Sequence, residues 1–185
     1  MKIKTKQWLL LCILCAVFLS GCAGDTSKEE TAPAPKEESA ETITFEAMDL
    51  EGNAVTSEIC ADSRLTMINV WATYCNPCLS EMPELGELAK EYKAEDFQLL
   101  GIVSDVLEEE DEEMLAYAAD LVEETEADYP HLLLNESLYK GMLQDVSAVP
   151  TTFFLNKEGE ILDVVVGAMD KSRWKEKIDG LLEDL

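Results

Sequence analysis

Residues 65–85, LTMINVWATYCNPCLSEMPEL, contain a change of pattern that decides the fold. Their first part, Leu65 to Trp71, is a nearly continuous apolar run, which is typical of a β-strand buried on both faces. From Asn76 onward the apolar residues recur every three or four positions, which indicates a helix: Leu79, Met82, Leu85, Leu88, Ala89 and Tyr92. Pro83 falls inside that helix and predicts a kink. The sequence therefore predicts a buried strand that leads directly into a helix.

Two cysteines, Cys75 and Cys78, lie at this junction in a Cys-x-x-Cys arrangement. The unpaired N–H groups and the dipole of a helix N-terminus favour an anion, and they lower a thiol pKa from about 8.5 toward 7 or below. Cys78 lies one turn further on the same face, close enough for a disulfide and more covered. Pro77 suits an early helical position, where its missing N–H is not needed. We therefore predict that Cys75 is the attacking thiol and Cys78 the resolving one.

Other roles for a Cys-x-x-Cys pair are a zinc site, a covalent haem and a structural disulfide. Structural zinc needs four ligands, and only Cys60 and His131 remain as further donors. Covalent haem attachment needs a histidine after the second cysteine, where this chain has Leu79. A structural disulfide stays possible in an oxidising compartment, although the strand–helix junction favours redox exchange. We predict no metal and no cofactor, and we expect Cys60 to be a small buried apolar residue, with a redox or mixed-disulfide role as the alternative.

The rest of residues 42–185 alternates between strand and helix patterns. A parallel crossover followed by an antiparallel pair predicts an α/β domain with a mixed central sheet flanked by helices. The expected strands are 43–50, 54–55, 97–103, 131–134, 151–155 and 161–166, with turns at 51–53 and 157–159, and the expected helices are 109–124, 136–144 and 172–182.

Two segments resemble those of a known family. Residues 71–85 resemble the active-site segment of extracytoplasmic thioredoxin-like oxidoreductases of the TlpA/ResA type. Residues 149–155, VPTTFFL, followed by Glu158-Gly159, resemble the second signature of that family, a cis-proline loop and its hairpin. The resemblance implies a thioredoxin fold with an N-terminal β-hairpin and a helical insertion between the second core strand and the cis-proline.

The resemblance also implies roles for single residues. Cys75 and Cys78 match the redox pair, and Pro150 matches the cis-proline, which would place the backbone of Val149 beside Cys75 to dock an extended substrate segment. Glu81 matches a glutamate that could tune the thiols or move a proton, the alternative being an ordinary solvent-facing helix residue.

Three further residues complete the predicted docking site: Thr151, Trp71 and Tyr74. We expect Trp71 and Tyr74 to shape the rim, with a plain core position as the alternative for Trp71. Ordinary thioredoxins have Trp where this chain has Tyr74, and Gly-Pro where it has Asn76-Pro77, so the redox potential stays open.

The N-terminal segment reads as a targeting signal. Three lysines precede an apolar run of 12 residues from Trp8 to Leu19, which is too short to span a bilayer comfortably. The following Leu19-Ser20-Gly21-Cys22 resembles a bacterial lipobox, in which Cys22 would be lipidated. We predict a signal peptide over 1–21 and a disordered tether over 22–41, rich in Glu, Lys, Pro, Ala, Ser and Thr. An ordinary signal peptide or an uncleaved anchor is the alternative.

The charge of the chain excludes some partners. A net charge of −25 argues against nucleic acid, whose phosphates need Lys and Arg, and against direct adhesion to anionic headgroups. The acidic run 108–113 fits a solvated helix face better than a metal site, because consecutive carboxylates spread around a helix.

These observations predict a thiol–disulfide oxidoreductase, anchored by lipid on the extracytoplasmic face of a bacterial membrane and working as a reductase. By resemblance, its substrates would be disulfide-containing extracytoplasmic proteins such as apocytochromes or methionine sulfoxide reductases, and a membrane dithiol carrier would supply electrons. The alternatives are a disulfide-donating oxidase, a peroxiredoxin-like peroxidase, whose motif is missing because Ala72 lies three residues before Cys75, and a thiol-dependent metal chaperone or adaptor.

Overall fold

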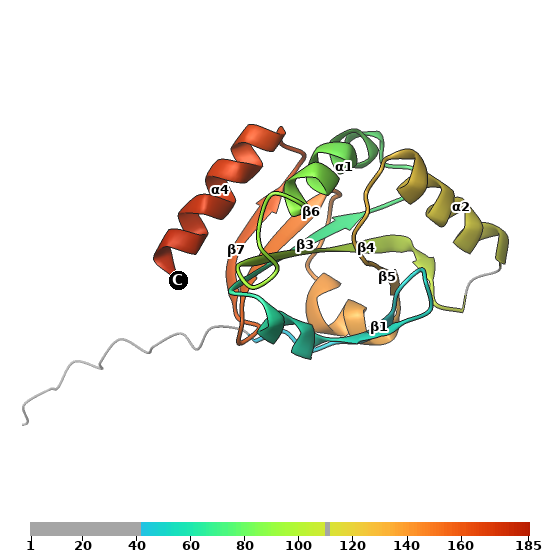
Figure 1. Ribbon diagram of the computed structural model, residues 1–185. Coiled ribbons are helices and arrows are strands. Elements are labelled where there is room, and N and C mark those ends of the chain that lie inside the picture. The colour runs from blue at the N-terminus through green and yellow to red at the C-terminus, as the bar shows by residue number, and fades with distance from the viewer. Residues whose placement is uncertain (1–41, 110–111) are drawn as a thin grey trace, which may run out of the picture. The chain divides into compact units, whose positions relative to one another are not determined.

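A five-stranded sheet in the order β5-β4-β3-β6-β7 forms the centre of the computed structural model, which describes residues 42–109 and 112–185 (Figure 1). β3 pairs in parallel with β4 and β4 with β5, whereas β6 runs antiparallel to both β3 and β7. The predicted mixed sheet is therefore confirmed. The strands are β3 (Leu65–Trp71), β4 (Phe97–Leu107), β5 (His131–Leu134), β6 (Thr151–Asn156) and β7 (Ile161–Val166).

The two faces of this sheet are covered by different elements (Figure 1). One face carries the three long helices: α1 (Asn76–Ala89), α2 (Glu112–Glu124) and α4 (Lys171–Asp184). The opposite face carries a small antiparallel sheet and three short helical segments: β1 (Glu46–Met48), β2 (Ala54–Thr56), η1 (Ser57–Asp62), α3 (Glu136–Leu138) and η2 (Tyr139–Leu143). Together these layers make the α/β thioredoxin fold that the resemblance implied, with its N-terminal hairpin and helical insertion.

The central strand β3 is buried along its whole length, as its apolar run predicted. Alternate side chains point to opposite faces of a sheet. Ile68 and Val70 pack in the cluster beneath β1 and η2. Leu65 and Met67 pack in the cluster beneath α4, and Trp71 in the one beneath α2. Asn69 points to the same face as Leu65, Met67 and Trp71. β3 therefore carries one fully buried polar side chain toward the long helices.

Several boundaries differ from the expected ones. The first expected strand, 43–50, contains only the three-residue β1, because Asp49 already turns the chain back through bonds to Glu51 and Asn53. β4 extends four residues beyond 103, and residues 136–144 divide into α3 and η2. α1 continues as a helix through Pro83.

The predicted signal peptide, the lipidation of Cys22 and the tether lie outside the described residues. Within 42–109 and 112–185, no helix is both long and apolar enough to cross a membrane.

Candidate active site

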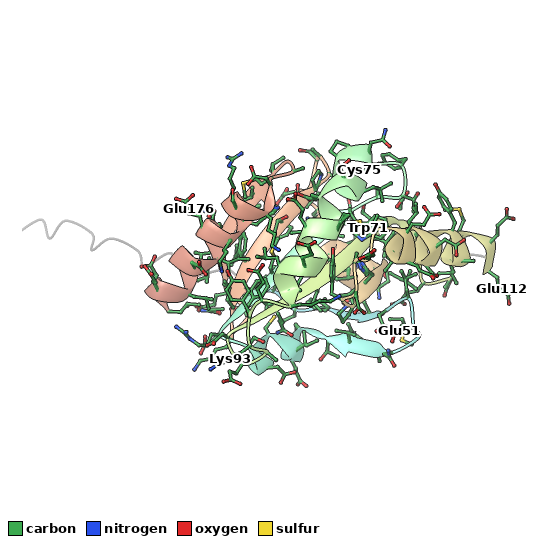
Figure 2. All side chains as sticks on the ribbon, turned by 45° about the horizontal axis from the view of Figure 1, so that its top comes forward. Glu51, Trp71, Cys75, Lys93, Glu112 and Glu176 are labelled. Atoms are coloured by element: carbon green, nitrogen blue, oxygen red, sulfur yellow. A yellow bond between two sulfur atoms is a disulfide. The ribbon has the colours of Figure 1, made fainter. Side chains whose placement is uncertain are left out.

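The two cysteines meet at the first turn of α1, where Cys75 occupies the N-cap position (Figure 2). They form a disulfide with Sγ atoms 2.03 Å apart. The backbone N–H of Cys78 donates to Sγ of Cys75 at 3.3 Å. The same N–H would stabilise a thiolate on Cys75 once the disulfide is reduced. Cys75 keeps 6% of its surface exposed and Cys78 none, so a partner can reach only the first cysteine.

The connection from β3 to α1 is held by the carboxyl end of β4. The carboxylate of Asp105 accepts the backbone N–H of Thr73 at 3.0 Å and its hydroxyl at 2.6 Å. The hydroxyl of Ser104 donates to the carbonyl of Trp71 at 2.9 Å. These contacts fix the loop that carries Cys75. Our sequence reasoning missed Asp105, although two polar residues directly after an apolar strand are a usable signal.

The loop before β6 lies against the disulfide. The Val149–Pro150 peptide bond is cis, as the resemblance implied. Val149 is half-buried and packs against the cluster that contains Cys75 and Cys78. Pro150 accepts the backbone N–H of Gly167 at 2.8 Å, which ties the loop to the end of β7.

Two of the predicted docking residues lie in the interior instead. Trp71 is fully buried between α1 and α2 (Figure 2), and its Nε1–H donates to Nδ1 of His131 at 3.0 Å. Thr151 is 3% exposed, pairs with strands on both sides, and donates its hydroxyl to the carbonyl of Ala148 at 2.7 Å. Trp71 therefore occupies the core position that was given as its alternative, and not the rim. The side chain of Thr151 also lies in the interior, and the substrate contact predicted for this residue stays a prediction. Tyr74, with 75% of its surface exposed, does lie on the rim.

Glu81 is buried beneath α1, with 4% of its surface exposed, so its solvent-facing alternative is wrong. Asn69 donates Nδ2–H to Oε1 at 3.1 Å, while the backbone N–H of Met169 and Nε1–H of Trp174 donate to Oε2 at 3.1 and 3.3 Å. Burial raises the pKa of Glu81, and the three hydrogen bonds oppose that rise without cancelling it. A carboxyl one helical turn after Cys78 is thus poised to hold a proton nearer neutral pH than an exposed glutamate would.

Sequence and structure comparisons agree with this geometry. Residues 33–182 match the model of the Redoxin family. The chain belongs to the Redoxin family. The thiol-disulfide oxidoreductase ResA of Oceanobacillus iheyensis is 30% identical over 150 residues, which cover 80% of this chain and 65% of that protein. This chain therefore spans slightly less than two thirds of that relative.

Two solved structures resemble this Redoxin-family fold. A thiol:disulfide interchange protein of the thioredoxin family from Chlorobium tepidum TLS is 20% identical with a TM-score of 0.66, covering 77% of this chain and 96% of that one. The pneumococcal exposed lipoprotein thioredoxin from Streptococcus pneumoniae strain TIGR4 is 24% identical with a TM-score of 0.60, covering 74% and 97%. Both likenesses confirm the predicted thioredoxin-like fold.

A polar row crosses the sheet of this Redoxin-family domain beneath α1. The strand register aligns His131 with Gly101, Gly101 with Asn69, and Asn69 with Thr152. A side chain at Gly101 would displace the imidazole, because its Cβ would lie 2.2 Å from Nδ1 of the His131 ring. Asn69 donates to Oγ1 of Thr152, its next neighbour in the row, at 3.0 Å, and also to Glu81 on α1.

His131 is neutral in this position. The indole N–H of Trp71 can only donate, so Nδ1 accepts and Nε2 carries the proton that bonds to the carbonyl of Ala127 at 3.0 Å. Burial lowers the pKa of His131 to about 4. Both ring nitrogens are engaged, and the imidazole packs against the ring of Tyr129 with centroids 4.4 Å apart and the planes tilted by 32°.

The donors that a zinc site would need do not converge. Cys60 is a free, buried cysteine in η1, and it packs in the cluster on the opposite face of the sheet from Cys78. Cys60 is thus buried, as predicted, and burial raises the pKa of its thiol. Among the described residues, no group of three or more His, Cys, Asp or Glu side chains is arranged to hold a metal ion.

Proposed function

We propose that this chain is a thiol–disulfide oxidoreductase that reduces disulfides in partner proteins through Cys75 and Cys78. One observation carries the proposal: a disulfide at the N-cap of α1, with one sulfur reachable and the other buried beside the Glu81 network. The similarity to thiol-disulfide oxidoreductase ResA supports the same activity.

The proposed reaction begins with both cysteines reduced. The thiolate of Cys75 attacks one sulfur of the partner disulfide, that S–S bond breaks, and the second partner sulfur leaves as a thiolate that takes up a proton. Cys78 then loses its proton and attacks Sγ of Cys75. The mixed disulfide breaks, the partner's first sulfur leaves as a thiol, and the Cys75–Cys78 disulfide forms. The partner gains two electrons and two protons, and a dithiol donor protein must supply them to start the next cycle.

Glu81 would serve the resolving step in this scheme. Cys78 and Glu81 are three residues apart on α1 and therefore share one face of the helix. Because Cys78 is fully buried, its proton needs an internal acceptor before the sulfur can attack. A carboxyl whose pKa burial raises suits that task near neutral pH.

The partner segment would dock along the cis-proline loop. Val149 packs against the cluster that contains the disulfide, and Tyr74, the residue before Cys75, is exposed. An extended segment can add hydrogen bonds to a backbone presented in this way.

We further propose that the protein acts on the extracytoplasmic face of a bacterial membrane, anchored by lipid on Cys22. The basic and apolar N-terminal segment and the Leu19-Ser20-Gly21-Cys22 pattern support this location, and the name of the pneumococcal structural relative, an exposed lipoprotein thioredoxin, agrees with it. The substrates would then be disulfide-containing extracytoplasmic proteins such as apocytochromes or methionine sulfoxide reductases, and the donor a membrane dithiol protein.

The test measures disulfide reduction by the full chain and then the reduction potential of the Cys75–Cys78 pair. We expect the reduced chain to cleave a small aromatic disulfide, Cys75→Ser to abolish the reaction, Cys78→Ala to accumulate a mixed disulfide, and the buried Cys60→Ala to change nothing. A potential at or below about −250 mV would support a reductase, whereas a value near about −120 mV would make the protein an oxidase. Unchanged activity in Cys75→Ser would overturn the proposal.

A further inference from the structure

The carboxylate of Asp105, near the end of β4, is bonded to the turn that carries Cys75. In this turn the backbone N–H of Cys75 donates to the carbonyl of Ala72 at 3.0 Å. Asp105 accepts from Thr73 inside the turn. The N–H of Thr73 lies 3.0 and 3.1 Å from the two carboxylate oxygens, and its hydroxyl donates to Oδ2 at 2.6 Å. A negative charge is therefore held at a fixed place beside the turn.

This charge has no cation as a partner within the described part of the chain. The ion pairs found there all involve other acidic residues. The three contacts to Asp105 all come from Thr73, which is uncharged. Asp105 is half-buried, so water and salt screen its charge less than that of an exposed carboxylate.

The other titratable groups around the turn have different partners. They lie on α1, α2 and β5, just after β4, and in the turn itself: Glu81, Glu112, Glu113, His131, Glu108 and Tyr74. Glu81 is bonded beneath α1, and His131 is neutral. Glu108 accepts the backbone N–H of Met48 on β1. Among the described contacts, Asp105 is thus the acidic residue bonded to the turn.

Asp105 lies close enough to Cys75 to act on the charge of its sulfur. Thr73 and Cys75 are two residues apart in a tight turn, which places the carboxylate within roughly 10 Å of the sulfur. Like charges at this distance near a protein surface repel enough to move a titration midpoint by about one pH unit. The N-terminus of α1 and the N–H of Cys78 favour a thiolate on Cys75, and Asp105 opposes them.

A thiolate that is less stable makes a dithiol a stronger reductant. The Cys75–Cys78 disulfide is uncharged, whereas the reduced pair carries the thiolate of Cys75. A nearby negative charge therefore disfavours only the reduced form. Strong disulfide donors have the opposite property, because their reduced form is the stabilised one.

We propose that Asp105 biases the Cys75–Cys78 pair toward the reductase direction, by holding a negative charge beside the turn that disfavours the Cys75 thiolate. The inference rests on the proposed disulfide exchange and adds an electrostatic role to the fixing of the loop. The hydrogen bonds of Asp105 go to Thr73 and not to a cysteine, so Asp105 is a positioning residue and not a catalytic one.

Asp105→Asn tests the charge while keeping the contacts. The amide oxygen can accept the N–H of Thr73, and the amide N–H can donate to the hydroxyl of Thr73. The rate at which iodoacetamide alkylates the reduced full chain is measured against pH, and mass spectrometry follows the peptide that carries Cys75. We expect the midpoint of this profile to lie about one pH unit lower than in the wild type.

The equilibrium with glutathione gives the second readout. The Cys75–Cys78 disulfide takes two electrons and two protons from two glutathione molecules, which join as glutathione disulfide. At pH 8 we expect the equilibrium constant for reduction to rise about fivefold to tenfold in Asp105→Asn, which corresponds to a potential about 20–30 mV higher. Asp105→Ser removes the charge with a different side chain and should change both readouts in the same direction.

Two further variants serve as matched controls. Ser104→Ala removes the neighbouring bond to the carbonyl of Trp71 without changing any charge, so it tests the geometry of the loop alone. Glu108→Gln removes a half-buried carboxylate just after β4 that is bonded to β1 and not to the turn, so it tests net charge alone. We expect both controls to keep the wild-type midpoint.

The outcomes separate the two proposals. A wild-type chain that does not reduce a small aromatic disulfide contradicts the proposed function itself. If the wild type reduces it, but neither Asp105 variant lowers the midpoint or shifts the glutathione equilibrium, the role of Asp105 is wrong and the proposed function stands. An equal shift in Ser104→Ala or in Glu108→Gln also overturns that role, because loop geometry or net charge would then be the cause.

Discussion

Two buried titratable residues, Glu81 and His131, lie beneath the long helices on the same face of the sheet. Burial moves the pKa of each toward the neutral form, upward for Glu81 and downward to about 4 for His131. The surroundings differ in one respect. Glu81 shares a helix face with Cys78, whereas His131 is enclosed by Trp71 and the carbonyl of Ala127.

This difference separates a group placed for chemistry from a group placed for packing. Both nitrogens of His131 are saturated by neutral partners, and its ring fills the space that Gly101 leaves open. Glu81 gathers three donors from β3, α4 and the segment before α4, which hold the carboxylate in place without neutralising it by a cation. A shifted pKa alone does not distinguish these roles, but each role predicts a different response to mutation.

The largest expected effect is on stability, at His131. Its pKa of about 4 lies below the ordinary 6.5. Between these two values, His131 is protonated in the unfolded chain but not in the folded one. The free energy of unfolding should therefore have its full value above about pH 6.5. It should fall by about 3 kcal/mol as the pH drops to about 4. Urea unfolding at intervals across this window measures the loss.

His131→Gln isolates that contribution, since an amide can still accept from Trp71 but does not titrate. We expect the variant to lack this part of the pH dependence and to keep wild-type disulfide exchange. If the unfolding free energies of the wild type and His131→Gln fall equally with pH, His131 does not cause the loss. If His131→Gln changes the rate of disulfide exchange, the contrast with Glu81 is wrong.

The second effect is on rate, at Glu81. Glu81→Gln removes the proton acceptor but keeps the shape, and the Asn69 amide can rotate to accept from the new glutamine. General acid–base catalysis contributes at least about a hundredfold, or 2.7 kcal/mol. We expect this loss in the resolving step, measured as the release of the second thiol from a small aromatic disulfide, with little change in the first.

The pH profile distinguishes this role from a merely structural one. In the wild type the resolving step should slow as Glu81 becomes protonated, at a pH above the ordinary value of 4.5. In Glu81→Gln that inflection should disappear. Equal slowing of both thiol releases, with the inflection kept, would show that the variant has disturbed Cys75 instead.

The local parts of this site could be predicted from the sequence. A buried strand, a helix start and a Cys-x-x-Cys pair between them all lie within 65–85, and backbone physics places Cys75 at the N-cap. The same reasoning gave the mixed sheet, because each strand and helix has its own periodicity.

The surroundings of Glu81 could not be predicted, because they come from distant residues. Its donors Asn69, Met169 and Trp174 are 12, 88 and 93 residues away along the chain. The position of Trp71 stayed open between the rim and the core for the same reason, since its hydrogen-bond partner His131 lies 60 residues away. A pattern confined to one segment does not reveal which helix will cover it.

The smallest effect tests Asn69, which belongs to the same row across the sheet as His131 and donates to Glu81 on α1. Asn69→Leu removes a hydrogen bond that favours the ionised form of Glu81, so the pKa of Glu81 should rise further. A shift of about one pKa unit would slow the resolving step by up to about tenfold below the inflection. The expected signature is an inflection moved to higher pH, with the rate on the alkaline plateau nearly unchanged.

Thr152→Val is the matched control for that experiment. It removes the other acceptor of the same Asn69 amide, has nearly the same shape, and leaves the bond to Glu81 in place. If the inflection moves in Asn69→Leu but not in Thr152→Val, Asn69 acts on the chemistry through Glu81. If both variants lose stability and neither moves the inflection, Asn69 belongs with His131 among the packing residues, and the state of Glu81 depends on Met169 and Trp174 instead.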